Sequence, residues 1–294
     1  MKAMEPARRA TLGLVFVGMA GCASQPRHFL DPADRSPVGG REAVVLVPQG
    51  EIKTVVVASQ AGAAFGLVGA IIDVSVNQHR ANAAEKSITP LRTALIDYQF
   101  DQQALAATQA TVAKMDWLAV RKTSFSKDTS KENTNSILDK SASSEVLFVS
   151  YSYELAADFA MMQVDARFTI SPKVVPKGQS IDSRIKLENA AYSENFTYLV
   201  PLAGAGEDVA ENCRRWSDHN AEIARRALDQ GIGGVNALAE RGLVQTSGDV
   251  QKLQQGAKVD AGGRKGKLIE KTDAGTLLLD DLGNWVFLAQ SPAG

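Results

Sequence analysis

The sequence predicts an α+β fold in which helices pack on a mostly antiparallel sheet, followed by a small C-terminal β-meander. Three observations predict this fold class. Residues 160–170 alternate between apolar and polar, which is typical of a strand with one buried face. A stretch beginning at Glu207 places apolar residues at helical spacing. Residues 256–290 hold short apolar runs separated by glycine-containing turns, which is typical of a meander.

The folded part is expected to begin with two paired strands. The apolar runs 43–47 and 52–58 flank Pro48-Gln49-Gly50, and this arrangement predicts a β-hairpin. A helix is expected to start at Thr89-Pro90, because Thr is a common N-cap and Pro fits the first helical turn. A further helix, rich in Ala and Gln, is expected over about 102–114.

The strongest strand signals lie in the middle of the chain. Residues 145–153 are rich in Val, Phe and Tyr, and the short link at 155–158 leads into the alternating strand, which predicts an antiparallel hairpin. Another strand is expected at 191–200. The segments before this hairpin predict a short strand at 117–120, a polar loop at 124–135 and a short helix at 136–141.

The C-terminal part is expected to hold a long helix and the meander. Acidic residues follow Glu207 in the first turn, where the helix dipole favours them. Gly231, Gly233 and Gly234 are expected to interrupt this helix before a second piece that ends at Gly242. The meander strands are expected at 267–271, 276–279 and 285–288.

Charge and cysteine content exclude several classes of protein. The chain has 294 residues and a formal net charge of −1, and residues 1–21 carry three basic residues and one acidic residue, so the remainder has a net charge of −3. This balance argues against a nucleic-acid partner, which needs a basic surface. There are two cysteines, Cys22 and Cys213. Cys213 lies in the predicted long helix, where it reads as a small, half-buried apolar residue.

No catalytic or metal-binding constellation is visible in the sequence. His28, His79 and His219 lack partners at metal-ligand spacing, so no metal or cofactor is expected. The segment Gly262–Lys267 fails the phosphate-loop template, because Leu268 stands where Ser or Thr is required and a strand follows. It is interpreted as a basic turn. The sequence therefore favours a protein that is not an enzyme.

The N-terminus carries the most specific motif. Arg8 and Arg9 precede an apolar stretch over residues 10–21, which is too short to span a bilayer, and Cys22 follows the small residues Ala20 and Gly21. This arrangement resembles the signal peptide of bacterial envelope lipoproteins. The resemblance implies cleavage before Cys22 and lipid attachment there. The open alternative is an ordinary secretory signal with cleavage near residue 23.

The resemblance also implies a location and a division of the chain. Ala23 follows the modified cysteine, where an aspartate would favour retention at the inner membrane, so the outer membrane facing the periplasm is expected. The signal peptide is residues 1–21. Residues 22–41 are rich in Pro and Gly and predict a flexible tether. The α+β domain is expected over 42–250, and a small β appendix over 251–294.

One internal segment is a candidate for close packing or self-association. Residues 61–72 carry no charge, and Gly62, Gly66 and Ala70 recur every four residues. Such a small-residue face lets helices approach closely. A buried helix accounts for it as well, and twelve residues are too few to span a membrane.

The order of elements over residues 88–243 resembles the α/β domains of outer-membrane lipoproteins that build secretion pores or activate cell-wall synthases. This likeness, the lipid anchor and the lack of catalytic motifs predict a binding or assembly module. Its partner is expected to be the membrane together with an envelope protein, a glycan or a second copy of itself. The alternative is a cell-envelope hydrolase with an unrecognised site.

Overall fold

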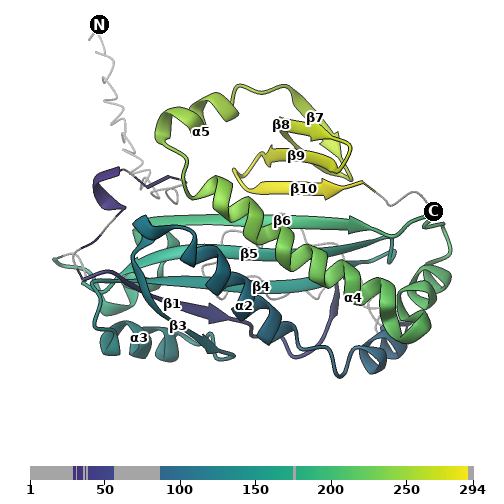
Figure 1. Cartoon of the computed structure of the whole chain (residues 1–294), viewed down its shortest axis with the longest axis horizontal. Helices are drawn as coiled ribbons and strands as arrows, with labels where there is room; N and C mark the ends of the chain where they lie inside the picture. The colour runs from purple at the N-terminus through teal and green to yellow at the C-terminus, as the bar shows by residue number, and fades with distance from the viewer. Residues whose placement is uncertain are drawn as a thin grey trace, which may run out of the picture.

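The fold is α+β, as the sequence predicts, and is built on one mixed sheet (Figure 1). The structure, a computed structural model, describes residues 29–30, 32–35, 37, 39–55, 87–174 and 177–290. Within these residues ten strands form a single sheet. The strands are β1 (Arg41–Leu46), β2 (Lys53–Val55), β3 (Val120–Ser126), β4 (Glu145–Ala156), β5 (Met161–Pro172), β6 (Tyr192–Pro201), β7 (Lys258–Ala261), β8 (Arg264–Thr272), β9 (Gly275–Asp280) and β10 (Trp285–Ala289).

The strand order is β3-β1-β4-β5-β6-β10-β9-β8-β7, with β2 continuing beside β4. Five pairings are antiparallel and four are parallel. Two long helices and a shorter one cover one face of the sheet, and α3 lies on the other side near β1 (Figure 1). The helices are a segment at 87–94, α2 (Phe100–Ala113), α3 (Lys131–Lys140), α4 (Val209–Gly242) and α5 (Ser247–Leu253).

The main core lies between the long helices and the central strands. Alternate residues of β4 and β5, such as Tyr151, Val164 and Phe168, are buried against α2 and α4. Fully burying a side chain of this size stabilises the fold by about 1.5–3 kcal/mol. A smaller cluster on the opposite face joins β1 and β4 to Leu138 of α3. The alternation predicted for residues 160–170 is therefore the pattern that separates these two faces.

The predicted hairpin between 43–47 and 52–58 is wrong. β1 and β2 do not pair with each other, and both run parallel to β4. Gln49 explains the difference, because its amide donates to the carbonyl of Tyr153 at 2.6 Å and accepts from the Tyr153 N–H at 3.2 Å. The side chain thus bridges the gap between β1 and β2 along β4. The chain continues in one direction instead of turning back.

The predicted loop at 124–135 is also wrong, and so are the bounds of the helix predicted at 136–141. Residues up to Ser126 complete β3, and α3 starts at Lys131, with the Ser130 hydroxyl capping it through the N–H of Asn133. β3 is the edge strand of the sheet and its side chains are mostly half-buried or exposed, so its sequence lacks an apolar alternation. The strand expected at 117–120 is instead a 3₁₀ turn, η3 (Asp116–Leu118).

Two helix boundaries also differ from those predicted. The helix at 87–94 already includes Ser87, so Thr89 is not its N-cap. The glycines expected to break the C-terminal helix lie inside α4, which continues to Gly242. Gly231 faces Val164 and Gly234 faces the ring of Tyr198, both so closely that a Cβ atom at either position would clash. These glycines bring the helix close to the sheet.

A kink interrupts α4 near its middle. His219, Asn220 and Ala221 have φ values of 52°, 58° and 56°, which place three successive residues in the left-handed region. Such a conformation costs a non-glycine residue roughly 1–2 kcal/mol. The guanidinium of Arg225 donates to the Asn220 carbonyl at 2.9 Å just after the kink. The kink changes the course of the helix where α4 approaches the segment at 87–94.

The C-terminal meander is continuous with the main sheet. β10 runs parallel to β6, so the strands of the predicted appendix extend the sheet of the α+β domain. At this junction the Trp285 indole N–H donates to Glu194 at 2.6 Å, and the Tyr192 hydroxyl donates to the same carboxyl at 2.5 Å. The strands of the two units predicted over 42–250 and 251–294 therefore belong to one continuous sheet.

The segment before β1 is packed against the domain, which corrects the C-terminal limit of the predicted tether at residue 41. Leu30 is 2% exposed and belongs to the main core. Arg35 donates to the carbonyls of Leu30 and Val244. Arg41, fully buried, forms an ion pair with Glu145 at 2.8 Å and donates to the carbonyls of Arg35 and Leu118. Buried guanidinium groups need such partners, which the sequence pattern did not reveal.

We expect Gly234→Ala to lower the free energy of unfolding by about 1–3 kcal/mol, because the added methyl group meets the Tyr198 ring. Gly233→Ala is the matched control. Gly233 is exposed in the same helix with nothing near its Cβ position, so this change is expected to raise stability by about 1 kcal/mol. Urea denaturation measures both. Equal effects of the two substitutions would contradict the close approach of α4.

The pH dependence of stability is expected to report on Glu194. Burial raises the pKa of Glu194 from 4.5 to about 8, although its hydrogen bonds with Tyr192 and Trp285 oppose the shift. Between these values the folded state holds a proton that the unfolded state has lost. The free energy of unfolding should therefore fall as pH rises from about 4.5 to about 8 and level off above that range.

Glu194→Gln tests this assignment, because the amide stays neutral and keeps an acceptor for Trp285. The variant should lose part of the pH dependence, measured as denaturation midpoints across this range. Some slope is expected to remain, because the pKa of Glu154 is also raised to about 8. An unchanged slope in the variant would contradict a protonated Glu194.

Candidate functional site

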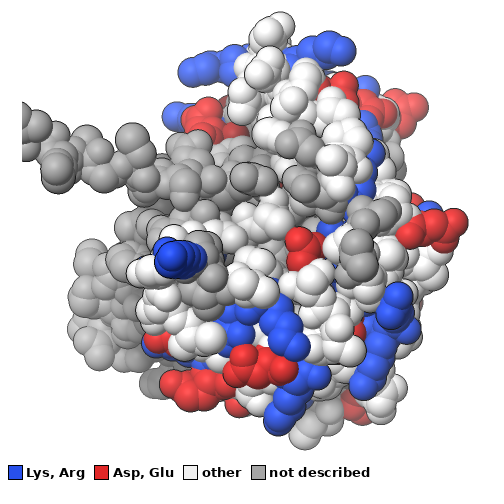
Figure 2. Space-filling view, turned by 90° about the vertical axis from the view of Figure 1, so that its left-hand side faces the viewer, with Lys and Arg blue, Asp and Glu red and all other residues white. Residues whose placement is uncertain are grey.

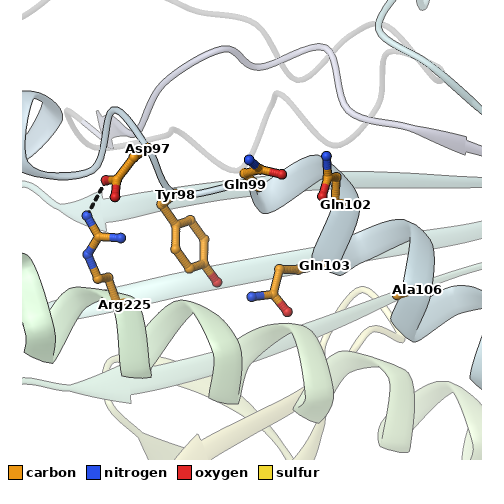
Figure 3. Close-up of a pocket in the computed structure, with 7 residues that line it drawn as sticks. All are labelled: Asp97, Tyr98, Gln99, Gln102, Gln103, Ala106 and Arg225. Carbon is orange, nitrogen blue, oxygen red and sulfur yellow. Dashed lines mark hydrogen bonds and ion pairs between the residues drawn. The ribbon is translucent and has the colours of Figure 1, made fainter.

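A hollow of about 560 Å³ lies between the start of α2 and the middle of α4 (Figure 3). Two segments of the chain form its sides. The turn after the helix at 87–94 presents residues 97–99 on one side, and the part of α4 after its kink presents Arg225 on the other. The lining residues are Asp97, Tyr98, Gln99, Gln102, Gln103, Ala106 and Arg225.

The charged groups of this hollow are paired with each other. Arg225 donates to the carboxylate of Asp97 at 2.5 Å and to the carbonyl of Ala94, which ties α4 to the preceding turn. Hydrogen bonding from Arg225 lowers the pKa of Asp97. The Tyr98 hydroxyl donates to Asp229 at 2.6 Å, and burial together with this hydrogen bond raises the pKa of Tyr98. The lowered pKa of Asp97 opposes a role as a general base.

The amides of this hollow are its available hydrogen-bonding groups. Gln99, Gln102 and Gln103 are exposed, and within the described part of the chain their side chains make no hydrogen bond. Figure 3 shows Gln103 directed into the space between the two helices, beside the ring of Tyr98. An amide offers two donors and an acceptor without net charge. The hollow therefore suits hydrogen bonding to a neutral polar partner such as a peptide backbone or a glycan.

A second hollow of about 420 Å³ lies beside the first and is partly apolar. Leu95, Ile96 and Leu228 contribute to it, and Ile96 is 87% exposed. Arg92 pairs with Glu51 at 3.4 Å at its rim. The two hollows share Tyr98, so together they form one uneven surface on the helical side of the domain.

The opposite face of the sheet carries a polar cluster. Asp165 accepts from Thr197 at 2.5 Å and from Gln163 at 2.6 Å, and Arg264 donates to Gln163. Burial and the neighbouring Asp165 raise the pKa of Glu154 to about 8, so Glu154 is largely protonated at neutral pH. A buried carboxyl with a raised pKa is found in acid–base sites and in structural networks alike. Neither of the two hollows described above is lined by them.

Most of the sites predicted from sequence lie outside the described residues. These are Cys22, the small-residue face of Gly62, Gly66 and Ala70, and His28 and His79. Two predicted landmarks can be placed. Cys213 is 2% exposed, and its thiol donates to the Ser87 carbonyl at 3.0 Å. His219 is exposed at the kink of α4.

The basic segment Gly262–Lys267 forms the hairpin between β7 and β8. Gly262 and Gly263 have φ values of 59° and 75°, which the tight turn requires. In the parts of the chain that are described, no group of three or more His, Cys, Asp or Glu side chains could hold a metal ion. None of the described helices has the length and apolar character needed to cross a membrane.

Comparison with models of known protein families gave no match, and comparison with curated protein sequences gave none either. Sequence reasoning identified the Ala- and Gln-rich helix but missed the hollow beside it. The spacing of Gln99, Gln102 and Gln103 at the start of the helix is a signal that the sequence shows. Arg225 lines the same hollow but is more than 120 residues away in the sequence, so no local pattern connects it with the glutamines.

Cys213 is expected to be unreactive in the folded protein. Burial raises its pKa from 9.0 to about 11, which lowers the thiolate fraction about 100-fold and opposes a nucleophilic role. The measurement is thiol labelling of the Cys22→Ala protein, in which Cys213 is the single thiol. Labelling of this protein should be slow in buffer and fast in denaturant. The blank is the same protein with the additional change Cys213→Ser. Fast labelling of the folded protein would instead favour a reactive site.

Proposed function

We propose that this protein is a lipid-anchored lipoprotein of the bacterial outer membrane, facing the periplasm, whose domain binds or assembles without catalysing a reaction. The observation that carries the proposal is Cys22 at the end of a basic and apolar leader. Its small neighbours Ala20 and Gly21 fit cleavage directly before the cysteine. Lipid attachment at Cys22 would then hold the domain at the membrane surface.

The helical surface supports a binding role. The charges in the larger hollow neutralise one another, and the remaining polar groups there are the amides of Gln99, Gln102 and Gln103. Neutral hydrogen-bonding groups beside an aromatic ring suit an envelope protein or glycan better than a strongly charged ligand. Gly62, Gly66 and Ala70 remain the proposed contact for assembly with a second copy.

One observation favours a second candidate, a cell-envelope hydrolase. Burial raises the pKa of Glu154 to about 8, and a hydrolase needs a carboxyl that stays protonated at neutral pH as its general acid. However, hydrogen bonds from Thr197 and Gln163 occupy both oxygens of Asp165. We therefore place this candidate second.

Expression of the full-length protein in a bacterial host beside Cys22→Ala tests the proposal. Wild type should sediment with the outer membrane and carry lipid, whereas the variant should be released or remain unprocessed. Crosslinking of intact cells before fractionation should give a discrete additional band with the anchored protein. Membrane attachment of Cys22→Ala equal to that of wild type would refute the lipid anchor.

A further inference from the structure

The chain between the lipid site and the domain is short. Cys22 lies eight positions before the buried Leu30, and eight residue steps span at most about 26–29 Å when fully extended. A tether extending to Arg41 would instead reach about 65 Å. The difference decides whether the domain can turn freely above a membrane or is held with one end close to it.

Hydrogen bonds and burial hold the segment after Leu30 in place. Arg35 reaches the Val244 carbonyl at 3.0 Å, and the buried Arg41 is paired with Glu145 at the start of β4. Leu30 itself is packed in the main core. The point at which the chain leaves the domain is therefore fixed at the end of the sheet where β1 and β4 begin.

Arg35, Trp117 and Val244 lie together at this end, and Trp117 is half-buried against the main core. The Arg35 guanidinium lies 5.3 Å from the ring centre of Trp117, and Val244 beside it is 42% exposed. Tryptophan and arginine place an apolar body and a polar tip at the same level, which suits lipid headgroups. Figure 2 views this end of the molecule, where basic, acidic and uncharged groups are mixed in the part that the structure describes.

We propose that the end of the domain formed by Arg35, Trp117 and Val244 rests against the phospholipid headgroups and is held there by the short tether between Cys22 and Leu30. This inference depends on the lipid attachment proposed at Cys22. It adds an orientation to that function, because the short tether determines which surface faces the lipid and which faces the periplasm.

The opposite end of the sheet then points away from the membrane. β4 begins at Glu145 beside the anchored end, and its last residue, Ala156, is about 36 Å away along the strand. Ala157 is exposed in the turn that follows. Ala33, which is exposed in the 3₁₀ turn η1 (Pro32–Asp34), lies in the packed segment, eleven positions after Cys22 in the sequence. These two alanines provide matched positions for probes.

The experiment uses the full-length lipidated protein in phosphatidylethanolamine–phosphatidylglycerol vesicles that contain a headgroup spin-labelled lipid. Ala33→Cys and Ala157→Cys each carry an environment-sensitive fluorophore, and the protein without either change controls for labelling of the buried Cys213. The label at position 33 should be strongly quenched, and the label at position 157 should not. A flexible Gly/Ser insertion between Ser24 and Gln25 that triples the tether length should abolish the difference.

The two proposals fail in different ways. Protein that is not lipidated and does not bind the vesicles refutes the anchor. Protein that is lipidated and bound, but is quenched equally at both positions or at neither, overturns the orientation. Quenching at neither position would instead favour a protein partner at this end. Quenching at position 33 that persists with the longer tether overturns the role of the tether.

Discussion

The close approach of α4 to the sheet is the constraint on which the rest of the structure depends. Gly231 and Gly234 leave room for Val164 and Tyr198, so the helix lies directly on β5 and β6. One part of α4 then carries Arg225 and Asp229 to the turn before α2 and so builds the hollow. The chain just after α4 presents Val244 to the N-terminal segment. A single packed helix thus positions both surfaces to which a role is assigned.

Sequence patterning predicted the elements whose burial is regular. The hairpin of β4 and β5, the strand β6 and the C-terminal meander were predicted because their side chains alternate or lie between glycine turns. β3 and β2 were misjudged for a physical reason. β3 is a half-buried edge strand without alternation, and the direction of β2 depends on one side chain, Gln49, pairing with a strand 104 residues away.

The candidate surfaces were harder to predict, because they depend on contacts between distant residues. The pairing of Arg225 with Asp97 joins residues 128 positions apart, and Arg41 meets Glu145 across 104 positions. Local periodicity carries no information about such pairs. The proposed lipid site is the opposite case, since recognition by processing enzymes needs only a short, contiguous stretch of sequence. The motif behind the proposed location could therefore be found in the sequence, whereas the proposed binding surface could not.

The place of β1 in the sheet affects how the chain can fold. β1 is the first strand in sequence, yet it lies between β3 and β4 and pairs in parallel with both. A chain made from its N-terminus must therefore hold β1 unpaired until about 80 further residues, up to β3, have followed. Contacts of such long sequence separation slow folding because a large loop must close first. The first strand of the chain therefore enters the sheet only after strands that are made later have followed it.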